Sequence, residues 1–307
     1  MARSTRSTGS GSTSIATANK AAARGIRMPI GSPPSVRVRR GKPRREIPYW
    51  LLAAILIGLM LVWAIVADQD YRIIFSALSG GIATTLYVTG LAFFLASALG
   101  LGFALMRTSG NRMFREIASF YIEIVRGIPI LVLLFYIAFV GAPFIVSGIN
   151  WVLSPIVAAG MVPEMSVRRF DFTWRAIFAL MIAYSAFIAE IFRAGIEAVD
   201  KGQVEAARAL GLKRWHVFRF IVAPQALRTI LPPYGNDFVS MIKDSALVSA
   251  LGVQDITQLG KVYSASTFRF FETYNVVAFL YLVMTISLSL LVRGLEHHLK
   301  RSSRQNA

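Results

Sequence analysis

Cysteine is absent from this 307-residue chain, which excludes disulfides and cysteine-ligated metal sites. Histidine is nearly absent too: there are three, His216, His297 and His298, and they form no His-Glu-x-x-His motif. We expect His297 and His298 to belong to a solvated basic tail. The sequence therefore predicts no metal site.

A phosphate-binding loop is also missing. Gly41-Lys42 and Gly260-Lys261 are the places where such a loop would end, but Pro43 and Val262 follow where Ser or Thr is required. The chain is expected to be non-catalytic and to hold no cofactor.

Acidic residues are scarce, with 16 Asp+Glu against 33 Lys+Arg, and the net charge is +17. Nucleic-acid binding is one interpretation of such a basic chain. The charge is concentrated, however, in the two tails, residues 1–47 and 293–307. Basic segments that flank membrane spans stay on the cytoplasmic side, so we favour a membrane protein without a nucleic-acid partner.

Two observations support this class: 55% of the residues are hydrophobic, and they are gathered into long apolar runs. Each clear run holds at least the roughly 17–25 residues that a membrane helix needs. The clear windows are residues 47–67, 82–106, 127–167 and 274–292, and the weaker ones are 176–189 and 238–254. The sequence predicts an all-α membrane protein with about six transmembrane helices. Gly141, Pro143, Gly148 and Pro155 predict that the chain leaves the membrane within the third window.

The organisation follows from these runs. We expect a disordered basic tail over residues 1–47, a first transmembrane helix over 48–67 acting as an uncleaved anchor, a core over 78–295 and a second basic tail over 296–307. With six spans, 25 Lys and Arg fall on the side of the termini and 6 on the other. Both termini are therefore predicted to be cytoplasmic.

A polar segment over residues 200–224 interrupts the apolar pattern on the cytoplasmic side. Asp200 is a helix cap with Gln203 three residues later, and Gly211 suits the left-handed position after a helix. A second helix is expected over 213–222, stopped by Pro224. Both helices are too short to span a bilayer and need packing partners. We favour a docking element for a cytoplasmic partner over a plain connecting loop or a DNA-reading helix–turn–helix.

This segment resembles the EAA loop of permease subunits of bacterial ABC importers. The resemblance rests on Glu205-Ala206-Ala207, Gly211, Ile221 and Pro224, with Ala223 where the family usually has Leu. Further stretches that resemble its polar-amino-acid branch are residues 122–129, 188–197, 231–236 and 242–247. The motifs occur in the family's order and cover about residues 78–295.

The resemblance implies a type I ABC importer permease fold in the bacterial inner membrane. It implies a cytoplasmic ABC ATPase that binds the ATP, a periplasmic solute-binding protein, a dimer with a second copy or a related permease, and surrounding membrane lipid. Glu205, Ala206, Ala207, Gly211 and Pro224 would form the coupling loop to the ATPase. Which amino acid is carried stays open, as does the role of residues 147–172.

Ionisable residues inside apolar segments are costly, so each is a candidate for a gate or translocation path. The candidates are Glu123, Arg126, Glu190, Lys243 and Asp244. Glu123 is spaced to pair with Arg126, and Glu190 to pair with Arg193, in both cases three residues apart on a helix. Interfacial anchoring is the alternative for Glu123 and Arg126. Lys243 and Asp244 are adjacent and cannot share a helix face, so either one faces the cavity or both lie at a membrane-edge turn.

Small residues recur at Ala92, Ala96 and Gly100, and again at Ala98 and Gly102. This spacing permits close helix contact, and we favour packing within the chain over a dimer seam. A stand-alone secondary transporter is the alternative function. It predicts inverted repeats, which the sequence does not show, and it leaves the 200–224 segment unexplained.

Overall fold

The computed structural model describes residues 49–304, so the predicted tail over 1–47 lies outside the described residues. Within 49–304 all regular structure is helical. The α-helices are α2 (Tyr49–Ala67), α3 (Gln69–Arg107), α4 (Arg112–Gly127), α5 (Ile130–Phe135), α6 (Ala142–Ala158), α7 (Phe172–Glu197), α8 (Lys201–Ala209), α9 (Arg214–Val217), α10 (Ala223–Asp244), α11 (Ile256–Thr267) and α12 (Phe270–Arg304). The π-helical segments are Tyr136–Gly141 and Phe218–Val222, and the 3₁₀ segments are Val167–Arg169 and Ser245–Leu251.

Four helical segments are long and apolar enough to cross a membrane: Gln69–Arg107, Ile130–Ala158, Phe172–Glu197 and Phe270–Glu296. A shorter apolar stretch, Ile55–Ala67, lies in α2. Four of the six predicted windows therefore correspond to spanning helices. At 39 residues, α3 is about 58 Å long, roughly twice the hydrocarbon thickness, so it extends beyond the membrane or crosses it tilted.

The weak window 238–254 is not one span. Helix α10 ends at Asp244, a 3₁₀ segment follows, and Gly252 turns the chain with a φ of 82° before Asp255 caps α11. The left-handed glycine and the new cap separate two helices where hydropathy alone suggested one.

The glycines and prolines of the third window do not break the helix at Gly141. The chain stays helical from Ile130 through the π segment to Ala158. Pro143 lies in the first turn of α6, directly after the widened π turn, where its missing N–H costs least. The chain leaves the helix only after residue 158.

The segment between α6 and α7 is tied down by two polar side chains. The Asn150 amide exchanges hydrogen bonds of 2.9 Å with both the N–H and the C=O of Met165. The buried Arg175 guanidinium donates to the carbonyls of Phe170, Ala138 and Val167. These bonds fold residues 159–171 back onto the start of α7.

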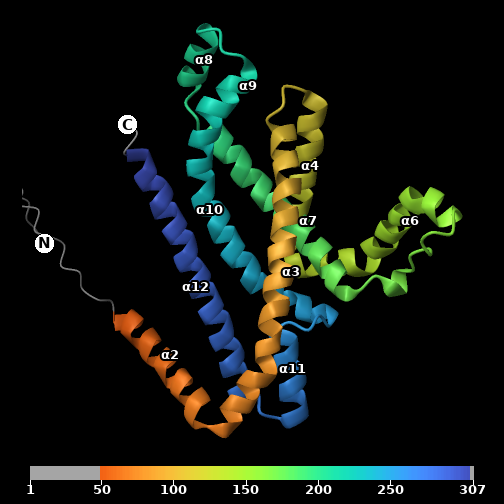
Figure 1. Ribbon diagram of the computed structural model, residues 1–307, viewed down its shortest axis with the longest axis vertical. Helices are drawn as coiled ribbons and strands as arrows, with labels where there is room; N and C mark the ends of the chain where they lie inside the picture. The colour runs from red at the N-terminus through yellow and green to blue at the C-terminus, as the bar shows by residue number, and fades with distance from the viewer. Residues whose placement is uncertain (1–48, 305–307) are drawn as a thin grey trace, which may run out of the picture. The chain divides into compact units, whose positions relative to one another are not determined.

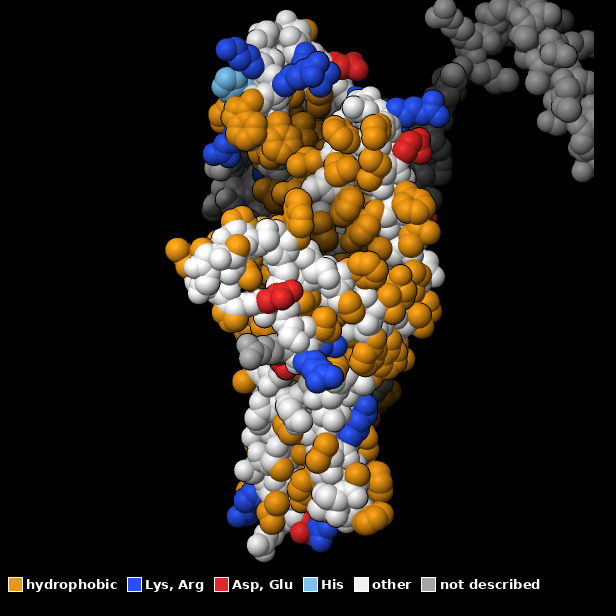
Figure 2. Space-filling model, turned by 90° about the vertical axis from the view of Figure 1, so that its right-hand side faces the viewer, with side chains coloured by type: hydrophobic (Ala, Val, Ile, Leu, Met, Phe, Trp, Pro, Cys, Tyr) orange, Lys and Arg blue, Asp and Glu red, His pale blue; other side chains and the backbone are white. Residues whose placement is uncertain are grey.

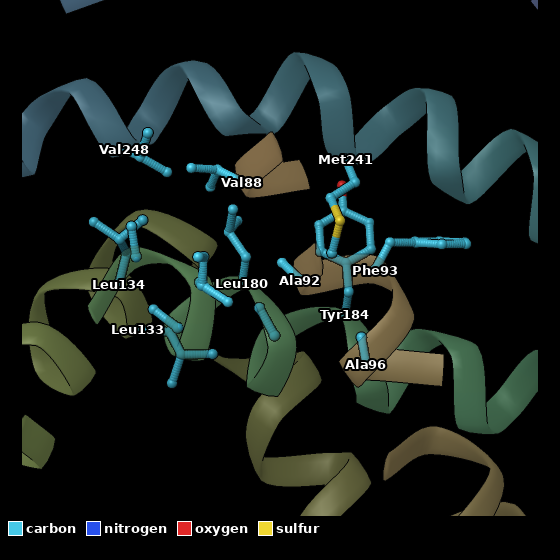
Figure 3. Close-up of a cluster of buried hydrophobic side chains, with 14 of the residues drawn as sticks. Val88, Ala92, Phe93, Ala96, Leu133, Leu134, Leu180, Tyr184, Met241 and Val248 are labelled. Atoms are coloured by element: carbon cyan, nitrogen blue, oxygen red, sulfur yellow. The ribbon is translucent and has the colours of Figure 1, made fainter. Parts of the chain in front are cut away.

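The main core lies between α3 and α7. Val88, Ala92 and Ala96 of α3 face Leu180 and Tyr184 of α7 (Figure 3). A Cβ added at Gly100 would lie 2.8 Å from the Ser185 carbonyl oxygen, so the two backbones touch. The stripe of Ala92, Ala96 and Gly100 is thus confirmed as packing within the chain, whereas Ala98 and Gly102 are exposed.

Within the described residues, α8 and α9 lie at one end of the helices, beyond the α3–α4 turn (Figure 1). The α2–α3 and α11–α12 connections lie at the opposite end. On the face shown in Figure 2, Lys and Arg side chains lie at both ends with a few near the middle, and hydrophobic side chains cover a large part of the surface between the ends. This distribution matches a chain whose middle lies in lipid.

Candidate functional site

The first half of the predicted docking segment folds largely as expected. The Asp200 carboxylate accepts the Gly202 N–H at 2.6 Å and caps α8. Gly211 has a φ of 80°, and the Leu212 N–H donates to the Ala207 carbonyl at 3.2 Å, which closes the helix end. Gln203 does not complete a capping box, because its side-chain oxygen accepts from Gln225 of α10.

The predicted stop at Pro224 is wrong. The backbone is helical without a break from Arg214 to Asp244, through α9, the π segment Phe218–Val222 and α10. The π turn ends just before Pro224, which lies in the first turn of α10, and the wider turn accommodates the proline ring. The second short helix is therefore the beginning of a long helix that leads into the core.

We call residues 201–217 the α8–α9 hairpin. Ala207 of α8 and Val217 of α9 are buried, at 4% and 3% exposed. Val204 packs against the buried cluster of Val199, Ala226 and Ile230, which joins the hairpin to the region where α7 ends and α10 begins.

The rest of the hairpin surface is open. Glu205, Ala206 and Gly211 are exposed. Leu210 and Trp215 are 83% and 65% exposed, and Arg208, Lys213 and Arg214 lie beside them in the sequence. An apolar surface of this kind at the end of a helix bundle is typical of a protein-binding site.

Charged side chains join α3, α4 and α7 below the hairpin. Arg107 donates to Glu190 at 2.7 Å, and Glu190 also pairs with Arg193, which confirms the predicted Glu190–Arg193 pair. Arg193 further pairs with Glu197. Sequence reasoning missed Arg107, although a cation that ends one span is a natural partner for an acid at the end of the next.

The predicted pair of Glu123 and Arg126 is wrong. Glu123 lies 4.0 Å from Arg107, and Arg126 lies over the ring of Phe187, 5.6 Å from its centroid. Both side chains find partners on neighbouring helices instead of on their own.

The surface of α4 has three distinct faces. Ala118, Ile122 and Val125 are buried. A second face is exposed and apolar, with Met113, Ile117, Phe120 and Ile124. A third is exposed and charged, with Arg112, Glu116, Glu123 and Arg126. Since exposed charge does not face lipid tails, this third face is suited to a water-filled space or another subunit.

Lys243 and Asp244 point apart, as expected for neighbours at a helix end. The Tyr184 hydroxyl donates to Asp244 at 2.6 Å. Lys243 is exposed and lines a cavity of about 310 Å³ with Thr285, Ser289 and Arg293. The tyrosine partner of Asp244 was not predicted, because it lies 60 residues away in the sequence.

A buried polar cluster at the start of α11 was also missed. Asp255 is 0% exposed, caps α11 through the Gln258 N–H at 2.8 Å, and accepts from the Tyr281 hydroxyl at 3.1 Å. Tyr281 also bonds Thr257 at 2.9 Å. Burial raises the pKa of the Asp255 carboxyl, and the hydrogen bonds oppose this only in part. The Asp-x-x-Gln capping pattern was the available signal.

Comparison with known proteins extends this picture. A family model described as the binding-protein-dependent transport system inner membrane component matches residues 96–305. The glutamine transport system permease protein GlnP of Escherichia coli (strain K12) is 36% identical over 222 residues, which are 72% of this chain and 91% of GlnP. The nopaline transport system permease protein NocM of Agrobacterium fabrum is 34% identical over 220 residues, 71% of this chain and 86% of NocM.

Solved structures agree. A chain from the crystal structure of an amino acid ABC transporter with histidines is 36% identical, with a TM-score of 0.61 over 76% of this chain and 97% of that chain. A chain of the inward-facing MetNI methionine ABC transporter is 20% identical, with a TM-score of 0.55 over 72% of this chain and 95% of its own, and shows the fold alone.

Proposed function

The chain belongs to the family of binding-protein-dependent transport system inner membrane components, and from this membership we propose that it carries a polar amino acid across the inner membrane. It is the permease subunit of an ABC importer. Relatives named for glutamine and nopaline transport support a polar solute with amino acid character. Family membership disfavours the stand-alone secondary transporter.

The observation that carries the coupling role is the unbroken helix from Arg214 to Asp244. Its first turns belong to the α8–α9 hairpin, and its last residue bonds Tyr184 in the middle of α7. A push on the hairpin is therefore transmitted along one continuous helical rod, which includes Pro232 and Pro233, to the charged residues of the core. Such a rod is the kind of two-position element that a ligand at either end biases.

We assign the hairpin as the docking surface for a separate cytoplasmic ATPase, which binds and hydrolyses the ATP. Glu205, Ala206 and Gly211 offer the contact surface, Ala207 holds the hairpin together, and Pro224 lies where the rod enters the core. This assignment places both termini in the cytoplasm. A periplasmic solute-binding protein delivers the solute on the opposite face.

The translocation path is assigned to the charged face of α4 and to the end of α10. Glu123, Arg126, Glu190, Lys243 and Asp244 lie on or near these surfaces. Because the charged face of α4 is exposed in one chain, a second permease copy or a related permease is needed to enclose it, with lipid around the pair.

Gly211→Pro tests this function. Proline cannot adopt the φ of 80° and removes the N–H that donates to Arg208 at 3.0 Å. We expect the variant to insert into the membrane normally but to lose most uptake and binding-protein-stimulated ATP hydrolysis in proteoliposomes. Gly110→Ala is the control, because Gly110 lies in the other turn at that end with no atom near its Cβ position.

Loss of membrane insertion by Gly211→Pro would instead make the hairpin a structural element. Uptake that continues without any ATPase would overturn the importer proposal.

A further inference from the structure

A charged recess lies between α8 and the α3–α4 turn. Its volume is about 710 Å³, within the roughly 300–1,000 Å³ range of small-ligand sites. One wall comes from Lys201, Glu205 and Arg208 of α8, which share a helix face. The other wall comes from the ends of α3 and α4.

The recess carries an excess of unpaired positive charge. Arg115, Lys201 and Arg208 line it, and none has an ion-pair partner in the described part of the chain. Arg107 also lines it but is paired with Glu190.

Two acids share the lining. Glu197 is already paired with Arg193. Glu205 is therefore one unpaired acid against three unpaired cations. Thr108 and Ser109 also line the recess, but the Thr108 hydroxyl donates to the Ala104 carbonyl at 3.0 Å and the Ser109 hydroxyl accepts from the Asn111 N–H at 3.2 Å, so the cations carry the site. Guanidinium and ammonium groups that line one recess are the recognition chemistry of a phosphate group.

The recess lies at the ends of two helices that are long and apolar enough to span a membrane. Arg107 ends the spanning helix α3, and Glu197 ends the spanning helix α7. On the side of α4 away from Arg115, Met113, Ile117 and Phe120 form an exposed apolar face that lipid can cover. Basic pockets between transmembrane helices on the cytoplasmic side bind anionic headgroups.

We propose that this recess binds the phosphate of an anionic phospholipid from the cytoplasmic leaflet and thereby fixes α8 against the α3–α4 turn. The binding itself is independent of the proposed function. Its consequence, a dependence of transport-coupled ATP hydrolysis on anionic lipid, rests on that function.

Binding is tested on the full-length chain in detergent by native mass spectrometry, comparing retained phosphatidylglycerol with phosphatidylcholine. Arg115→Gln removes one wall cation from an exposed position, so folding is expected to be unaffected. We expect retention about fivefold weaker, the loss appropriate to one cation near an anionic surface. Lys201→Gln, from the opposite wall, should act in the same direction.

Arg112→Gln is the matched control. It removes the same charge from the same helix, but Arg112 is 87% exposed, lies 3.9 Å from Glu116 and does not line the recess. Equal losses in Arg112→Gln and Arg115→Gln, or no preference for phosphatidylglycerol, would overturn the proposal.

Two further experiments test whether inorganic phosphate or the ATPase occupies the recess instead of a lipid. Inorganic phosphate that binds in the absence of anionic lipid, and is lost in Arg115→Gln, would keep the phosphate chemistry but overturn the lipid source. Loss of ATPase co-purification in Arg115→Gln regardless of lipid would show that the recess receives an acidic surface of the ATPase, and would also overturn it.

For the reconstituted complex, we expect ATP hydrolysis in phosphatidylcholine vesicles to rise when phosphatidylglycerol is added, and to rise less in Arg115→Gln. Lipid retention without this rise would support the site and count against the proposed coupling role alone.

Discussion

The α3–α7 seam and the α8–α9 hairpin are built in opposite ways. Along the seam, Ala92 and Ala96 are 0% exposed, and Gly100 lets the backbones meet. In the hairpin, Ala207 and Val217 are the two buried residues, and most of the others are exposed. The seam needs nothing from outside the chain, whereas helices as short as α8 and α9 rely on packing partners.

The difference between a tightly packed seam and a loosely supported hairpin is expected in a protein that transmits movement from one site to another. Within a membrane, close backbone packing replaces the hydrophobic effect as the source of helix association, so the seam is rigid. Elements that move come from regions with few buried contacts. The predictions below test whether stability belongs to the buried regions and coupling to the hairpin.

Gly100→Val should have the largest effect. The new side chain would meet the Ser185 carbonyl oxygen at 2.8 Å and the Ala189 N at 3.1 Å, and neither backbone can move easily. We expect a loss of about 3 kcal/mol or failure to fold, read as the melting temperature in detergent. Gly102→Val is the control, since no atom lies within 4 Å of its Cβ position. Equal stability of the two variants would mean that the seam is loosely packed.

Asp255→Ala should have the next largest effect. It leaves the Gln258 N–H and the Tyr281 hydroxyl without their buried acceptor, at a cost of about 1–3 kcal/mol. Asp171→Ala removes a cap of the same kind, at 3.1 Å from the Thr173 N–H, but from an exposed position. We expect the control to lose about 1 kcal/mol or less of unfolding free energy. An equal loss in both variants would reduce the Asp255 cluster to an ordinary helix cap.

The ionisation of Asp255 should make a smaller, pH-dependent contribution. Because its pKa is raised in the folded chain, the protonated form is favoured on folding. This stabilisation is present below the ordinary aspartate pKa and is lost as pH rises through the raised pKa. Asp255→Asn, which is neutral throughout, should be destabilised relative to the wild type at low pH by less than Asp255→Ala, and its melting temperature should fall less as pH rises. A parallel pH dependence in wild type and Asp255→Asn would assign the effect to other groups.

Features that depend on residues close together in the sequence could be predicted from the sequence. The Asp200 cap, the left-handed Gly211, the Glu190–Arg193 pair and the inward stripe at Ala92 and Ala96 all follow from spacing along one helix. These features were confirmed because the interacting groups lie within a few residues of each other or share one helix face.

Features that depend on neighbouring helices were not predictable in this way. Glu123 forms an ion pair with Arg107 of α3, and Asp244 accepts a hydrogen bond from Tyr184 of α7. Pro224 did not stop its helix, because the π turn before it removed the conflict that ends a regular α-helix at proline. Hydropathy also joined α10 to the 3₁₀ segment after it, since it does not register a left-handed glycine.

Trp215→Ala should have the smallest effect on stability. It tests most directly whether the hairpin serves ATPase binding while the α3–α7 seam serves stability. Trp215 is 65% exposed on the hairpin, so the unfolding free energy of the permease alone should change by no more than about 0.5 kcal/mol. Exposed tryptophans are often hot spots once a partner covers them, so affinity for the ATPase should fall by at least about tenfold. Trp151→Ala on α6, where Trp151 is 79% exposed, controls for removal of a surface indole and should leave ATPase affinity unchanged. Titrating the purified ATPase against each variant in nanodiscs gives the affinities. If Trp215→Ala binds as tightly as Trp151→Ala, the exposed apolar face of the hairpin is not where the ATPase docks.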